Sequence, residues 1–166
     1  MKKILNLGVS PKTQVVLSYP VNPSKFKPVR AGMDSLRERH GIKKDDVVIL
    51  AVGRLVYKKG YDYLIRAIEL LKKYKIKLLI AGEGDLKSTW QQLSKSLGVE
   101  DKVLFIGNIK RDEIVNYYNL SDVMVAPSII DKGGNVDGGP VASFESMACG
   151  KAQIVTNVLG IAEVIR

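Results

Sequence analysis

The chain is poor in the residues that build disulfides and metal centres. Its 166 residues contain one cysteine, one histidine and one tryptophan. A single cysteine excludes an internal disulfide, and the small apolar residues around Cys149 predict a packing role in a reducing setting. A single histidine, His40, excludes a metal site built on histidines and leaves Cys149 without a credible partner for nucleophilic catalysis. We therefore expect no metal site, and we expect His40 to carry its charge at a helix end.

Long apolar runs are also absent. No stretch approaches the roughly 20 apolar residues of a membrane-spanning helix, and the apolar part of the N-terminus is too short for a signal peptide. We therefore expect a cytoplasmic protein. Acidic residues are the minority, 17 against 26 basic ones, and the net charge of +9 favours phosphates, nucleic acid or an anionic membrane surface. The lysines lie in scattered pairs, as is typical of a solvated face, so charge alone leaves these partners open.

Short apolar runs alternate along the chain with segments of helical spacing. The expected strands are Val15–Tyr19, Val47–Val52, Lys77–Ala81, Val103–Ile106, Val123–Ala126 and Ile154–Val155. Their near-continuous apolarity predicts strands covered on both faces. The expected helices are Tyr61–Tyr74, Leu86–Leu97, Arg111–Asn119 and Ala142–Ala148, and Trp90 is expected in the core. The alternation predicts a single α/β domain with a doubly wound, mostly parallel, Rossmann-like sheet, whose ligands bind beyond the carboxyl ends of the strands.

Two loops at that expected edge carry residues suited to a nucleotide. Arg54 and Lys59 follow an expected strand. The forked guanidinium of an arginine and the charge of a lysine together suit a diphosphate. Two ordinary surface cations would give the same sequence pattern. The stretch Gly82–Asp85 lacks the full glycine pattern of a dinucleotide site. We interpret it as a tight turn before a helix that Asp85 caps, with the glycines open to a packed nucleotide.

Two carboxylates, Asp137 and Glu145, flank a glycine-rich turn. We expect Asp137 in a loop and Glu145 in the first turn of a helix, whose free backbone N–H groups favour an anion. Taken singly, Asp137 reads as a turn former and Glu145 as a solvated helix residue. Their occurrence with Arg54 and Lys59 on one predicted edge favours a nucleotide sugar.

Segments that run in order along the chain resemble one known family. They are Tyr19–Pro28, Gly53–Gly60, Ile80–Gly84, Phe105–Gly107, Asp122–Ser128, Asp137–Lys151 and Gly160–Glu163. The series is similar to the C-terminal domain of retaining glycosyltransferases of family four, the glycosyl transferases group 1. The resemblance implies one half of a GT-B architecture, in which two Rossmann-like domains face a cleft and the second binds the nucleotide-sugar donor.

The resemblance also implies roles for single residues. Arg54 and Lys59 hold the diphosphate, Asp137 faces the sugar hydroxyls and Glu145 faces the ribose; Arg54, Lys59 and Glu145 are the expected catalytic group. The other expected substrate contacts are Gly82, Gly84, Gly107, Asn108, Ile109, Gly138, Gly139 and Val141. The donor carries UDP, GDP or ADP, and no cofactor or metal is expected. Asp137 departs from the family, which usually has glutamate there, so its sugar contact is expected to be longer, bridged by water or adapted to another sugar.

The resemblance divides the chain into two parts. Residues 1–30 correspond to an inter-domain linker with one strand, and residues 31–166 to a nucleotide-sugar-binding domain that the family continues further. The family's first domain, which carries the acceptor site, is missing, so we expect the isolated chain to bind donor weakly and to transfer nothing. That domain is an expected partner. The full-length protein could also bind a membrane surface or a lipid-linked acceptor. In that case we expect it to be membrane-associated.

Two alternatives remain at this stage. The chain fits a non-catalytic nucleotide-binding or subunit-interaction module that complements a separate first-domain chain. Nucleic-acid binding through the charge of +9 is disfavoured, because the lysines are scattered and no aromatic residues interleave with them. We therefore expect no nucleic-acid partner.

Overall fold

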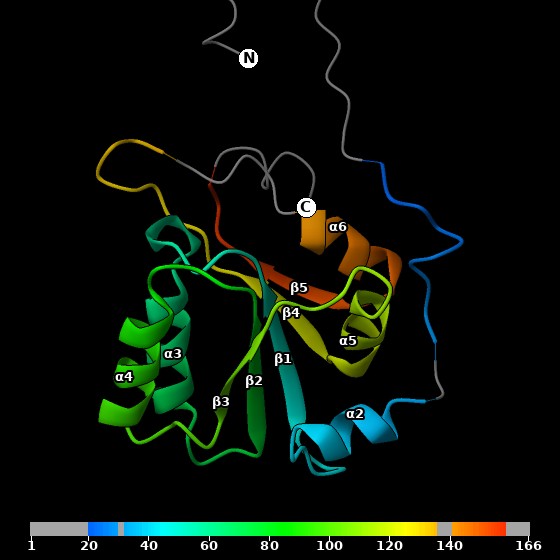
Figure 1. Cartoon of the computed structure of the whole chain (residues 1–166), viewed down its shortest axis with the longest axis horizontal. Coiled ribbons are helices and arrows are strands. Elements are labelled where there is room, and N and C mark those ends of the chain that lie inside the picture. Colours follow the sequence, from blue (N-terminus) through cyan, green and yellow to red (C-terminus); the bar gives the residue numbers. More distant parts are fainter. Residues whose placement is uncertain (1–19, 30–31, 136–140, 159–166) are drawn as a thin grey trace, which may run out of the picture.

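The computed structural model describes residues 20–29, 32–135 and 141–158. These residues contain one parallel sheet. Its strands are β1 (Val47–Val52), β2 (Ile76–Ala81), β3 (Val103–Gly107), β4 (Val123–Ala126) and β5 (Ala152–Val155), in the spatial order β3-β2-β1-β4-β5 (Figure 1). The strand order reverses beside β1, so a crevice is expected at the carboxyl ends of β1 and β4. The predicted doubly wound parallel sheet is confirmed. The expected strand Val15–Tyr19 lies outside the described residues.

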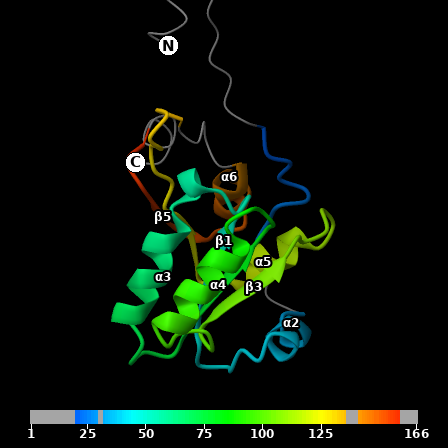
Figure 2. The same ribbon diagram turned by 60° about the vertical axis from the view of Figure 1, so that its left-hand side comes forward.

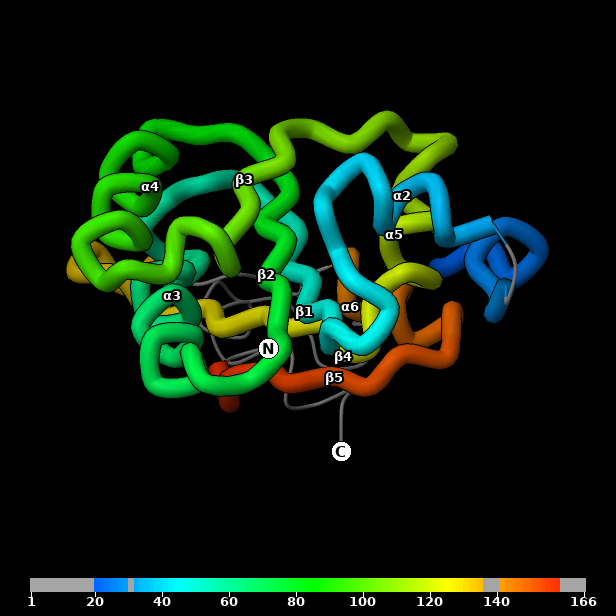
Figure 3. Tube along the Cα trace, turned by 90° about the horizontal axis from the view of Figure 1, so that it is seen from below, coloured from blue at the N-terminus to red at the C-terminus, as the bar shows by residue number. Residues whose placement is uncertain are grey.

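Helices cover both faces of the sheet. The helices α3 (Tyr61–Leu70) and α4 (Lys87–Ser96) lie on one face, and α2 (Asp34–Arg39), α5 (Ile114–Leu120) and α6 (Val141–Ala148) lie on the other. Figure 2 shows α3 and α4 side by side, and the view along the strands in Figure 3 shows the helices of the two faces on opposite sides of the sheet. None of the helices in the described segments is long and apolar enough to cross a membrane.

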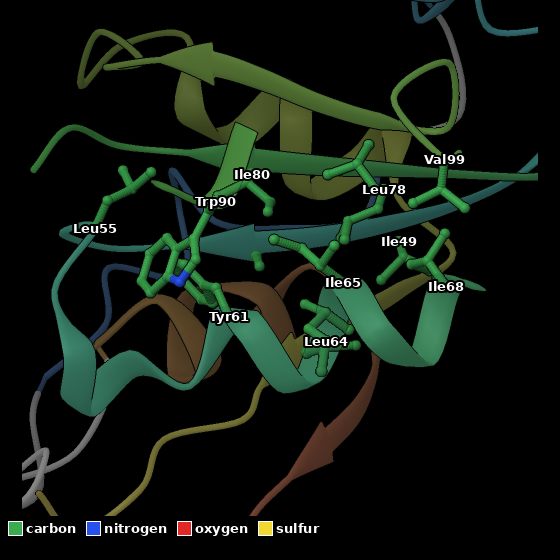
Figure 4. Packing of buried hydrophobic residues seen from close by; sticks show 13 residues of the cluster. Ile49, Leu55, Tyr61, Leu64, Ile65, Ile68, Leu78, Ile80, Trp90 and Val99 are labelled. Carbon is green, nitrogen blue, oxygen red and sulfur yellow. The ribbon is translucent and has the colours of Figure 1, made fainter. Parts of the chain in front are cut away.

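Each face of the sheet has its own apolar core. On the α3 side, Leu78 and Ile80 of β2 are fully buried against Ile65 and Ile68 of α3 (Figure 4). Trp90 is 3% exposed and meets the ring of Tyr61 edge to face, with 5.3 Å between ring centroids. The expected core position of Trp90 is therefore confirmed. On the opposite face Cys149 is buried among α5, α6 and β4, as its apolar setting predicts.

Some helix boundaries differ from the sequence-based expectations. The helix α3 ends at Leu70, and α5 begins at Ile114 after a turn. Asp85 does not cap α4, because the helix begins at Lys87 with Leu86 at the capping position and no side-chain cap. Apolar periodicity predicts which residues share a buried face, but it extends through exposed turns and so misplaces the ends.

His40 corrects a second expectation. Partial burial and then the neighbouring Arg39 lower the pKa of His40 below its ordinary value, so both make the expected positive charge less favourable. Its Nε2 lies 3.1 Å from the hydroxyl of Tyr117, and the two rings also touch. The helix α2 is a short element whose last residue is Arg39. The ring therefore joins α2 to α5 in the packing, and its role is structural as expected.

The segment of residues 20–29 lies against α5 and forms no strand. The side-chain amide of Asn119 donates to the Lys27 carbonyl at 3.1 Å, and its oxygen accepts from the Val29 N–H at 2.8 Å. Phe26 is buried and lies against Tyr118, with 6.1 Å between ring centroids. These contacts fix the segment to α5. The predicted division of the chain at residue 30 stays a prediction.

Candidate functional site

A pocket of about 520 Å³ opens at the carboxyl ends of β1, β2 and β3, between α5 and α6. Its lining includes these residues predicted from the sequence: Arg54, Lys59, Gly82, Asn108, Ile109, Val141 and Glu145. Residues more than 90 positions apart in the sequence therefore meet at one edge of the sheet, as expected for a doubly wound fold. Gly84 and Gly107 lie just outside the lining, next to Glu83 and Asn108. Asp137, Gly138 and Gly139 lie outside the described residues.

The loop after β1 folds back so that Lys59 reaches the pocket. A single 3₁₀ turn, Tyr57–Lys59, ends at Gly60, whose φ is +64°. The Lys59 side chain lies over Gly53, where an added Cβ would be 2.9 Å from Lys59 Cε and 3.1 Å from Nζ. A residue larger than glycine at position 53 would therefore displace the ammonium group. The loop thus holds Lys59 beside Arg54, which follows Gly53 directly and is exposed at the pocket.

The two glycines of the β2–α4 loop allow it to approach the β1 loop closely. A Cβ on Gly82 would lie 2.0 Å from the Gly53 carbonyl oxygen, and one on Gly84 would lie 2.5 Å from the Leu55 oxygen. The Leu55 N–H donates to the Glu83 carbonyl at 2.9 Å and joins the loops. The expected tight turn is present. Backbone contact is a sufficient reason for both glycines, and Gly82 also borders the pocket.

Glu145 comes from α6 but not from its first turn. The helix begins at Val141, which places Glu145 fifth in the helix, just past the first turn. The hydroxyl of Tyr118 donates a hydrogen bond to Glu145 Oε2 at 2.7 Å. Burial, and next the Glu145 carboxylate, raise the pKa of the Tyr118 hydroxyl far above its ordinary value. The hydroxyl therefore stays protonated and remains a hydrogen-bond donor.

Sequence reasoning missed several residues of the lining. Three of them lie in and just before α5: Arg111, Ile114 and Tyr118. Their spacing of three and four residues places them on one helical face, so helical periodicity could have grouped them. Glu83 lines the pocket mouth and forms an ion pair with Lys87 at 2.8 Å. It lies between the two glycines, and the rule that places loops at the carboxyl edge could have identified it.

The charges at this site suit a phosphorylated ligand that also carries hydroxyl groups. Arg54, Lys59 and Arg111 supply positive charge, and Glu83 and Glu145 supply carboxylates that accept hydrogen bonds. In the described part of the chain, no three His, Cys, Asp or Glu side chains cluster so that they could hold a metal ion.

Comparison with known proteins places the chain in a family. Residues 32–166 match the family model described as glycosyl transferases group 1. The chain is a member of this family. An uncharacterized glycosyltransferase of Methanocaldococcus jannaschii is 33% identical over 169 aligned positions, which cover 99% of this chain and 42% of that protein. A second relative, 32% identical, is a GDP-mannose-dependent phosphatidylinositol monomannoside mannosyltransferase of Mycolicibacterium smegmatis. That alignment covers 78% of this chain and 35% of the relative.

The structural comparison agrees on the fold of this group 1 glycosyltransferase chain. The crystal structure of HepE from Anabaena in complex with UDP-glucose superposes with a TM-score of 0.83 at 19% identity, over 99% of this chain and 44% of that one. The chain therefore has the Rossmann-like fold of one half of a GT-B glycosyltransferase. It spans less than half the length of these relatives.

Proposed function

We propose that this chain is the donor-binding half of a retaining glycosyltransferase that transfers a hexose-type sugar from a nucleotide diphosphate sugar. The observation that carries the proposal is the single pocket in which Arg54, Lys59 and Glu145 meet. Two relatives support a hexose donor, one described as GDP-mannose-dependent and one solved with UDP-glucose. One name carries GDP and the other UDP, so we propose a class of donor without assigning its base.

In this proposal the diphosphate lies against Arg54 and Lys59. During transfer an acceptor oxygen bonds to the anomeric carbon and the bond between that carbon and the diphosphate oxygen breaks. The leaving diphosphate takes the bonding electron pair and accepts the proton that the acceptor hydroxyl loses. The two cations neutralise that charge as it develops, which lowers the barrier most when they are already in position. We propose that these side chains do this without a metal ion, so nucleotide binding is expected to persist in EDTA.

The remaining pocket residues hold the other parts of the donor. Glu145 accepts hydrogen bonds from the ribose hydroxyls, and the loop with Asn108 and Ile109 packs on the base. The backbone N–H of Val141, the first residue of α6, is proposed to face the phosphates, as is typical of a helix N-terminus. Asp137, Gly138 and Gly139 are proposed to meet the sugar.

The acceptor site is proposed to lie on a second domain that faces this pocket. The relatives are more than twice as long as the part that this chain matches, which supports such a partner domain. An acceptor held by one domain and a donor held by the other react only when both are oriented and water is excluded. Donor binding by this chain alone is therefore expected to be weak and its transfer activity undetectable.

The test is a titration of the chain with UDP, GDP and ADP, followed by NMR, which detects weak binding. Removing a cation that contacts phosphate costs about 1.5–3 kcal/mol, so Arg54→Ala and Lys59→Ala are each expected to weaken the preferred nucleotide about tenfold or more. Lys58→Ala is the matched control, because Lys58 adjoins Lys59 but does not line the pocket. Its affinity is expected to change less than about twofold.

The outcomes separate the candidate functions. Nucleotide binding that ignores both Arg54→Ala and Lys59→Ala contradicts the proposed site. Binding that depends on them, combined with no transfer even when the partner domain is supplied, favours the non-catalytic nucleotide-binding module. Transfer of a hexose by the complete protein, lost with Arg54→Ala and Lys59→Ala and kept with Lys58→Ala, supports the proposed enzyme.

A further inference from the structure

We propose that Tyr118 is a positioning residue that orients the Glu145 carboxylate toward the ribose of the donor. This inference rests on the proposed function. It assigns a role to a side chain that the sequence motifs do not single out. Tyr118 lies in the middle of α5, whereas Glu145 comes from α6, and both line the same pocket.

The geometry gives the hydroxyl control over the carboxylate. Tyr118 Oη donates to Glu145 Oε2 at 2.7 Å, the short distance expected of a hydroxyl bonded to a charged oxygen. This bond fixes one carboxylate oxygen and thereby sets the plane of the whole group. Glu145 also lines the pocket, and in this proposal its second oxygen, Oε1, receives a ligand hydroxyl there.

The ring that carries this hydroxyl is closely packed. Tyr118 is 1% exposed, and Phe26 packs on it at an interplanar angle of 57°. Phe26 belongs to the segment of residues 20–29, which Asn119 ties to α5 by hydrogen bonds to Lys27 and Val29. A flexible glutamate side chain loses rotamer freedom when it grips a ligand, and an anchored one has already lost it. The Tyr118 bond therefore prepares Glu145 before the donor arrives.

The neighbouring tyrosine offers a matched control. Tyr117 is also buried in α5, but its hydroxyl meets His40 Nε2 at 3.1 Å, and it does not line the pocket. Tyr118→Phe and Tyr117→Phe each remove one buried hydroxyl and keep the ring. They differ in whether the lost hydroxyl reaches Glu145.

The experiment compares two ligands on each variant. One ligand is the tightest-binding nucleoside diphosphate among UDP, GDP and ADP, and the other is its 2′,3′-dideoxy counterpart, which lacks the hydroxyls that Glu145 is proposed to hold. Tyr118→Phe is expected to weaken the ribose ligand about tenfold, as for loss of a hydrogen bond to a charged group. It is expected to weaken the dideoxy ligand by less than about twofold, and Tyr117→Phe is expected to leave both within about twofold.

A second comparison uses Glu145→Ala, which removes the acceptor of the Tyr118 hydroxyl. If Tyr118 acts through the Glu145 side chain, adding Tyr118→Phe to Glu145→Ala produces no further loss for the ribose ligand. Equal weakening of both ligands by Tyr118→Phe, or additive losses in the double variant, would overturn the positioning role while Arg54 and Lys59 still support the proposed function. A chain whose nucleotide binding does not depend on Arg54 and Lys59 refutes the proposed function, and this inference with it.

Discussion

Gly82 makes a quantitative prediction possible, because its backbone and its surroundings both exclude a side chain. Its φ is +136°, a conformation that side-chain-bearing residues rarely adopt, and an added Cβ would lie 2.0 Å from the Gly53 carbonyl oxygen. The neighbouring backbone has little room to yield. The Gly53 N–H donates to the Ala81 carbonyl at 2.9 Å, and the Gly82 N–H donates to the Gly107 carbonyl at 2.8 Å. Gly82→Ala must therefore strain the ends of β1, β2 and β3 together.

The cost follows from two contributions. A strained backbone conformation costs about 1–3 kcal/mol, and forcing extra atoms into a packed site costs about as much again. We expect Gly82→Ala to lower the free energy of unfolding by about 4 kcal/mol, a large part of the total for a typical domain. Gly98→Ala is the control. Gly98 also has a positive φ, +64°, but no atom lies within 4 Å of an added Cβ.

Gly98→Ala is expected to cost about 1 kcal/mol, because the left-handed penalty is partly offset by the stiffer unfolded chain. The assay is urea unfolding followed by the fluorescence of Trp90, which is buried and is the only tryptophan in the sequence. The expected gap between the two variants is about 3 kcal/mol. Equal losses would refute the packing argument. A loss of nucleotide binding at full stability would instead assign Gly82 to ligand contact.

Two further predictions concern groups away from the pocket. The pKa of His40 is lowered from 6.5 in the folded chain, so the unfolded chain binds more protons as the pH falls through that value, and the free energy of unfolding decreases. His40→Gln should make this decrease smaller. An unchanged pH profile would contradict the burial of the ring. Burial also raises the pKa of the Cys149 thiol, so iodoacetamide should label the native chain far more slowly than the urea-unfolded chain, and equal rates would contradict the buried position.

The sequence predicts β1 to β4 well, because each is a short apolar run, whereas the polar Gln153 hides the first half of β5. The bounds of β1 and β4 agree with the sequence-based ranges, Val47–Val52 and Val123–Ala126. The same rule of strand ends predicts the meeting of Arg54, Lys59 and Glu145 at one edge, which the pocket confirms. Whether these side chains bind a donor stays a prediction.

Side-chain contacts between helices are the part that the sequence does not reveal. The bond from Tyr118 to Glu145 joins residues 27 positions apart, and no local pattern encodes it. The position of the Lys59 side chain over Gly53 depends on a 3₁₀ turn. This turn has no apolar periodicity from which the sequence could predict it. For His40 the sequence indicates a helix end but not the partial burial that lowers the pKa.

The central claim is that a nucleoside diphosphate binds in the pocket where Arg54, Lys59 and Glu145 meet. The most direct measurement is a crystal structure of the chain with the preferred nucleoside diphosphate. We predict phosphate oxygens within hydrogen-bond distance of Arg54 and Lys59, with the ribose hydroxyls on Glu145. A nucleotide bound elsewhere on the domain, or bound in this pocket with its phosphates away from both cations, would contradict the account.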